Sequence, residues 1–102
     1  MVYNKLVRDK IPQIIESQGQ KVNIRILDSR EYTHHLEQKL DEEVGEYHKE
    51  RNLEELADIL EVIYALAENL GASKEELTAI YDQKHASRGG FREKIFLISK
   101  EG

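Results

Sequence analysis

The chain has 102 residues, of which 39% are hydrophobic and 34% charged, and this length is typical of one domain, residues 1–102. A net charge of −5 disfavours a nucleic-acid polymer as partner. The absence of cysteine excludes disulfides, thiolate zinc sites and cysteine nucleophiles. No apolar run has the length of a signal peptide or a membrane span, so we expect a cytoplasmic protein without membrane contact.

The first thirty residues predict a short helix and a short strand. Asp9 can cap a helix that carries Pro12 in its first turn, where a missing N–H matters little, and Gly19 would end it. Residues 22–27 (VNIRIL) are rich in β-branched side chains and alternate imperfectly, which indicates a strand.

Three longer helices are predicted by their start signals. Each signal is a capping residue followed three positions later by Glu: Asp28–Glu31, Asn52–Glu55 and Ser73–Glu76. We expect these helices to end near residue 50, at residue 70 before Gly71, and before residues 89–90. The predicted fold is therefore mainly α, a helical bundle.

The end of the chain resembles a strand again. Residues 94–99 (KIFLIS) are apolar and β-branched, like residues 22–27. The two segments could pair as a small two-stranded β ribbon beside the helices.

The predicted helix over residues 53–70 is apolar on most of its sides. A helix of this kind must be buried nearly all round. Because three other helices cannot easily enclose it, we expect it to form the interface of a homo-oligomer, a dimer or tetramer. The alternative is burial by the other helices of the same chain.

Acidic side chains concentrate in the middle of the sequence. Residues 37–61 hold ten acids against three bases, a charge of −7, and the flanking segments are basic. Glu43 and Glu46 are three apart, as are Glu55 and Asp58, so the members of each pair share a helix face. In an antiparallel hairpin turning near Arg51, Glu43 lies level with Asp58 and Glu46 with Glu55. Four carboxylates would then converge.

Four carboxylates in one cluster repel one another unless a positive charge lies among them. Two like charges about 4 Å apart repel by roughly 4 kcal/mol at an effective dielectric near 20. Mg²⁺ takes oxygen ligands, commonly a few carboxylates with water and substrate phosphates, so we expect a Mg²⁺ or Mn²⁺ site. Gly45, inside the helix, is consistent with a close approach there. The alternative is an ordinary solvated acidic face.

Four segments carry a family resemblance. Residues 42–46 (EEVGE) and 55–58 (ELAD) resemble the EExxE…ExxD signature of the all-α nucleoside triphosphate pyrophosphohydrolases, which include MazG, the dimeric dUTPases and phosphoribosyl-ATP pyrophosphohydrolase. Residues 3–12 (YNKLVRDKIP) and 88–91 (RGGF) resemble a subgroup of small phosphoribosyl-ATP pyrophosphohydrolase-like proteins. One departure is the gap of eight residues between Glu46 and Glu55, shorter than in typical MazG domains, which implies a tight hairpin.

The resemblance implies a bundle of the all-α NTP pyrophosphatase type and an activity. The activity is Mg²⁺-dependent hydrolysis of a nucleotide between its α- and β-phosphates, giving a monophosphate and pyrophosphate. The implied metal ligands are Glu43, Glu46, Glu55 and Asp58. Glu42 and Glu43 would be catalytic, with Glu42 orienting a metal-bound water. The phosphates would be held by Lys5, Arg8, Lys84 and Arg88.

Two other functions compete with this one. The chain could be a non-catalytic helical module that binds a nucleotide–metal complex or a protein partner. The ExxH spacing of Glu31 and His34 also matches a di-iron element, but the sequence has no second ExxH.

Overall fold

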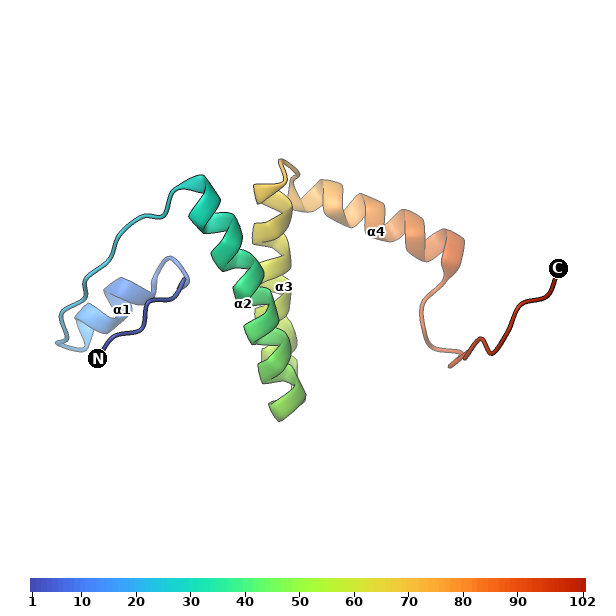
Figure 1. Cartoon of the computed structure of the whole chain (residues 1–102), viewed down its shortest axis with the longest axis horizontal. Coiled ribbons are helices and arrows are strands. Elements are labelled where there is room, and N and C mark those ends of the chain that lie inside the picture. Colours follow the sequence, from blue (N-terminus) through green and yellow to red (C-terminus); the bar gives the residue numbers. More distant parts are fainter.

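The computed structural model describes all 102 residues and contains four helices and no strand. They are α1 (Ile11–Ser17), α2 (Ser29–Glu50), α3 (Leu53–Asn69) and α4 (Lys74–Arg88). Helices α2 and α3 form an antiparallel hairpin, and α1 and α4 extend from it on opposite sides (Figure 1). The mainly-α class is thereby confirmed, although one chain alone does not close its helices into a bundle. No helix combines the length and apolar composition needed to cross a bilayer.

The start of α2 is fixed by the predicted capping box. The Asp28 carboxylate accepts from the Glu31 backbone N–H at 2.9 Å, and the Glu31 carboxylate accepts from the Asp28 N–H at 3.3 Å. Arg25 in the preceding segment adds an ion pair to Glu31 at 2.7 Å. The Arg25 guanidinium and the Asp28 N–H lower the pKa of Glu31 to about 2.

This lowered pKa predicts a pH dependence of stability. Since the unfolded chain takes up the Glu31 proton near pH 4.5, ionised Glu31 stabilises the fold above that pH, and this contribution is lost as the pH falls from 4.5 towards 2. We expect Glu31→Gln to be less stable than the wild type at pH 6, and the difference to be much smaller at pH 2.5, measured by urea unfolding. Glu37→Gln, an exposed control on α2, should show no such convergence.

The turn between α2 and α3 is two residues long. Arg51 ends α2 in the left-handed conformation (φ 51°), and the Asn52 side chain accepts from the Glu55 N–H at 3.0 Å. At the other end of the hairpin, Asn69 of α3 donates to the Thr33 hydroxyl of α2 at 2.8 Å. The relative height of the two helices is thus fixed at both ends.

Two local predictions are wrong. Lys10, and not Asp9, occupies the N-cap of α1, and its side chain makes no capping hydrogen bond. The β ribbon is absent because residues 22–27 and 94–99 lie on opposite sides of the hairpin, separated by α4 (Figure 1). Extended backbone becomes a strand only when a second segment lies close enough to exchange hydrogen bonds.

Few side chains are buried within one chain. Only Leu36, Val62 and Ala67 are buried, and they lie on the two helices of the hairpin. The alternative expectation, that the other helices of the same chain bury the helix over residues 53–70, is wrong, since Leu53, Leu56 and other apolar side chains of α3 remain exposed.

Gly45 faces open space near the C-terminal end of α2, five residues before its last residue. A Cβ built at this position meets no atom within 4 Å, so the expected close approach does not occur within the chain. Glycine in a helix interior costs about 1 kcal/mol relative to alanine. We expect Gly45→Ala to raise the free energy of unfolding by about 0.5–1 kcal/mol in urea titrations. A loss of stability would show that another surface packs there.

Candidate metal centre

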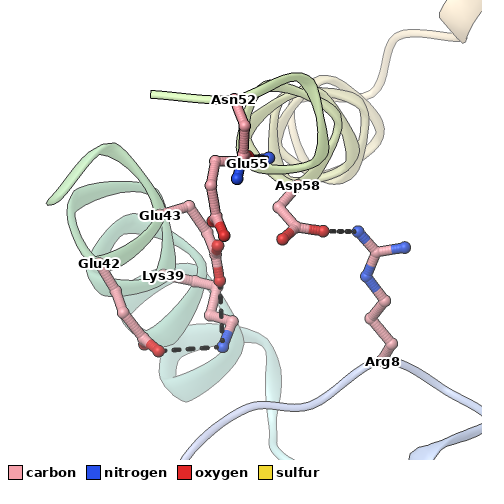
Figure 2. Close-up of polar contacts among 7 residues, drawn as sticks. All are labelled: Arg8, Lys39, Glu42, Glu43, Asn52, Glu55 and Asp58. Carbon is pink, nitrogen blue, oxygen red and sulfur yellow. Dashed lines mark hydrogen bonds and ion pairs between the residues drawn. The ribbon is translucent and has the colours of Figure 1, made fainter. Parts of the chain in front are cut away.

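Three carboxylates converge between α2 and α3. Glu43 comes from α2, and Glu55 and Asp58 come from successive turns of α3. Each offers one oxygen such that the three oxygens lie within 4.8 Å of one another, and all three residues are half-buried. Figure 2 shows their side chains pointing towards a common point between the two helices.

The hairpin geometry explains this convergence. The two-residue turn makes the helices antiparallel from their first turns, so residues at similar distances from the turn lie at similar heights. Glu43 is eight residues before Arg51 and Asp58 is six residues after Asn52, so their heights along the hairpin differ by only about 3 Å. The Asn52 cap holds the first turn of α3, which carries Glu55, against the same gap.

Three basic side chains surround the cluster. Arg8, from the segment before α1, donates from Nη2 to Asp58 Oδ1 at 2.7 Å. Lys39 Nζ lies 3.5 Å from Glu43 and 3.4 Å from Glu42, and Lys5 Nζ lies 3.7 Å from Glu42. The N-terminal segment is thereby attached to the hairpin at the position of the cluster (Figure 2).

Glu55 is the carboxylate with no cationic neighbour. No basic nitrogen lies within ion-pair distance of it, whereas Asp58 and Glu43 each have one. Partial burial raises the pKa of Glu55, and the charges of Asp58, Glu46, Glu43 and Glu50 raise it further. Negative charge is therefore in excess at this end of the cluster.

Removing this charge should stabilise the protein when no metal is present. Because the pKa of Glu55 is higher in the folded state, the fold loses stability as the pH rises from 4.5 through that raised pKa. We expect Glu55→Gln to unfold at higher urea concentration than the wild type at pH 7, with the difference vanishing at pH 4. Added Mg²⁺ should stabilise the wild type and not the variant. If Mg²⁺ stabilised both proteins equally, Glu55 would not be a ligand of the proposed metal centre.

The donor set suits a hard divalent cation. Ligands on opposite sides of an octahedral Mg²⁺ lie about 4.2 Å apart, so oxygens within 4.8 Å need only a small side-chain rotation or a bridging water. The charge at this position is also negative. Six acids gather here with three bases: Glu42, Glu43, Glu46, Glu50, Glu55 and Asp58 with Lys5, Arg8 and Lys39.

A pocket of about 290 Å³ opens beside the cluster. It is bounded by the N-terminal segment on one side and by the hairpin on the other, and both acids and bases line it. The lining residues are Lys5, Val7, Arg8, Ile11, Lys39, Glu43 and Asp58. A small anionic ligand could therefore contact the cluster and the bases together.

The other predicted site residues lie in different places. Glu46 is half-buried on α2, next to the three converging carboxylates but outside their 4.8 Å group. Glu42 is exposed and paired with two lysines. Lys84 and Arg88 lie on α4, which extends away from the hairpin, so one chain does not bring them to the cluster (Figure 1).

Lys39 contacts the carboxylate cluster, but the sequence did not predict it as a site residue. Its spacing of three and four residues from Glu42 and Glu43 is the helical signal that identifies it. The Arg8–Asp58 pair spans fifty positions, and no local spacing could have indicated it.

Comparison with known proteins adds little to this geometry. No protein-family model matches the chain, and no solved structure matches it. A stretch of 42 residues, 41% of the chain, is 50% identical to an uncharacterized protein of Mycolicibacterium smegmatis. The match spans 43% of that relative, less than half of its length.

Proposed function

We propose that this protein is a Mg²⁺-dependent nucleotide pyrophosphohydrolase of the all-α NTP pyrophosphatase type. The observation that carries the proposal is the convergence of Glu43, Glu55 and Asp58 with their oxygens within 4.8 Å. The resemblance of residues 42–46 and 55–58 to the EExxE…ExxD signature supports the same activity. The reaction would cleave the bond between the α- and β-phosphates and release a monophosphate and pyrophosphate.

The carboxylates would hold the metal, with Mn²⁺ as an alternative to Mg²⁺. When bound, the ion supplies positive charge for phosphate oxygens and acidifies water. Glu46, one helical turn from Glu43, completes the ligand set that the resemblance implies. Glu42 lies at the edge of this set, where its carboxylate can orient a water molecule or accept its proton.

The bases of the N-terminal segment would bind the phosphates. Arg8 and Lys5 line the pocket beside the carboxylates, and a guanidinium suits the oxygens of a phosphate group. In the apo protein Arg8 pairs with Asp58. An exchange of partners, with Asp58 turning to the metal and Arg8 to the substrate, would therefore accompany binding.

A substrate panel in isotopically labelled water tests the proposal. Purified protein is incubated with Mg²⁺ and canonical and modified nucleoside triphosphates, and released pyrophosphate is measured with and without EDTA. We expect EDTA-sensitive release from at least one nucleotide. Water containing ¹⁸O should label either the monophosphate or the pyrophosphate, which identifies the attacked phosphorus. If no nucleotide in a broad panel releases pyrophosphate, the proposed activity is wrong.

A second candidate is a non-catalytic module that binds a nucleotide–metal complex or a protein partner. The observation in its favour is that Arg8 and Lys39 already neutralise part of the cluster without a metal. Calorimetry with Mg²⁺ and a non-hydrolysable triphosphate distinguishes the two. Tight binding of the analogue without turnover of its natural counterpart would favour the module.

A further inference from the structure

The N-terminal segment, residues 1–10, is attached to the hairpin by charged side chains. Arg8 Nη2 lies 2.7 Å from Asp58 Oδ1, and Lys5 Nζ lies 3.7 Å from Glu42 (Figure 2 shows the Arg8 pair). These two pairs are the only polar contacts between the segment and the hairpin, since no backbone hydrogen bond joins them. No side chain of the segment is buried, and no Cα of α1, which follows it, lies within 8 Å of a Cα of another helix.

This attachment is easily reversed. The side chains of Arg8 and Asp58 are 56% and 41% exposed, and the Lys5 side chain is also exposed. Ion pairs between exposed side chains contribute little to stability, and dissolved salt screens them. Lys39 differs, because its side chain is only 18% exposed and lies on the same helix as its partner carboxylates. Among the cations at the cluster, those of the N-terminal segment are therefore the ones that can leave.

A divalent cation competes with Arg8 for the same carboxylate. Asp58 is one of the three residues whose oxygens lie within 4.8 Å of one another, and it is also the partner of Arg8. An ion held by the three carboxylates carries two positive charges next to the guanidinium, and like charges repel. Glu42, the partner of Lys5, borders the same cluster, so the second ion pair is weakened as well.

A phosphate ligand has the opposite effect. Lys5 and Arg8 line the pocket of about 290 Å³ that opens beside Glu43 and Asp58. Phosphate oxygens can bind Mg²⁺ and at the same time accept hydrogen bonds from a guanidinium or an ammonium group. A polyphosphate in this pocket therefore returns to Arg8 and Lys5 the negative charge that the cation takes from them.

From these contacts we propose that the N-terminal segment is a strap over the candidate metal centre, which a divalent cation alone releases and a cation together with a polyphosphate closes again. The inference rests on the proposed function, because it uses the same carboxylates and the same pocket. It extends the exchange of partners at Arg8 to the whole segment. The strap is held by carboxylates in the free protein and by phosphates in the complex.

Backbone order measured by ¹⁵N relaxation tests this strap. The amides of residues 6–10 report on it, and those of residues 22–27, which are also non-helical, serve as the internal control. The three samples are the free protein, the protein with excess Mg²⁺, and the protein with excess Mg²⁺ and methylenediphosphonate, a non-hydrolysable analogue of pyrophosphate. For residues 6–10 we expect order parameters of about 0.85, below about 0.6 and again about 0.85 in these samples. Residues 22–27 should not change.

Two matched variants each remove one positive charge from the segment. Arg8→Gln removes the cation that pairs with Asp58, so residues 6–10 should already be mobile in the free protein and should not regain order with methylenediphosphonate. Lys10→Gln removes an exposed cation that forms no ion pair, and it should behave like the wild type in all three samples.

The amide shifts of the hairpin around Glu43 and Glu55 show in the same samples whether Mg²⁺ binds. If Mg²⁺ shifts these signals while residues 6–10 keep the order of the free protein, the strap is wrong and the metal centre is retained. Release by Mg²⁺ without closure by methylenediphosphonate would also overturn the strap. If Mg²⁺ shifts none of these signals, the metal centre and the strap are both wrong.

Discussion

Replacing Asp58 with Asn, or Glu43 with Gln, is expected to reduce Mg²⁺-dependent pyrophosphate release by at least about 100-fold. Loss of a group that merely supports a metal ligand commonly costs 10–100-fold, and these side chains are proposed as ligands themselves. Each amide keeps the size of the side chain while removing the negative charge that attracts the cation. The measurement is initial rate against Mg²⁺ concentration on a nucleotide that the wild type cleaves.

Two matched controls remove the same charge elsewhere on α2. Asp41→Asn and Glu37→Gln change exposed acids that are not members of the carboxylate cluster. Both should retain wild-type rates within about twofold, because exposed charges contribute little at this distance. If the controls lose as much activity as Asp58→Asn, the rate depends on the overall acidity of the hairpin. If Asp58→Asn remains fully active, Asp58 is not a ligand.

Leu36→Ala is expected to cause the largest loss of stability among single substitutions. Leu36 is only 3% exposed and is the most deeply buried side chain of the hairpin. Truncating a buried leucine costs about 2–5 kcal/mol, because apolar contacts are lost and a cavity remains. We expect about 3 kcal/mol in the free energy of unfolding, measured with urea at a fixed protein concentration.

Leu97→Ala in the C-terminal tail is the matched control. Leu97 is 77% exposed, and an exposed leucine contributes within about 0.5 kcal/mol. If Leu36→Ala cost less than 1 kcal/mol, packing of α2 against α3 would not be the main source of stability. A large cost at Leu97 would show that the tail is covered in solution.

The carboxylate cluster shows how much of the site the spacing of residues along the sequence can predict. Antiparallel geometry and equal distance from the turn predicted that Glu43 and Asp58 lie level, and the structure brings both together with Glu55. Glu46 lies outside the close group because height along a helix does not fix the direction around it. Three residues along α2 turn the side chain by about 60°.

Contacts between segments that are far apart in the chain could not be predicted from the sequence. The capping boxes at Asp28 and Ser73 are local, and both are present in the structure. A strand, in contrast, needs a partner strand, and residues 22–27 have none within the chain. Burial of the helix over residues 53–70 by the other helices of the same chain does not occur either, since Leu53, Leu56 and Leu60 remain exposed.

Paramagnetic broadening by Mn²⁺ tests most directly whether the hairpin binds a divalent cation. Mn²⁺ titrated into ¹⁵N-labelled protein broadens the amide signals nearest the ion. We expect signals around Glu43 and from Glu55 to Asp58 to disappear first, and excess Mg²⁺ to restore them. If the acidic first turn of α4, at Glu75 and Glu76, broadened first while the hairpin signals stayed sharp, the cation would bind elsewhere and the proposed centre would be wrong.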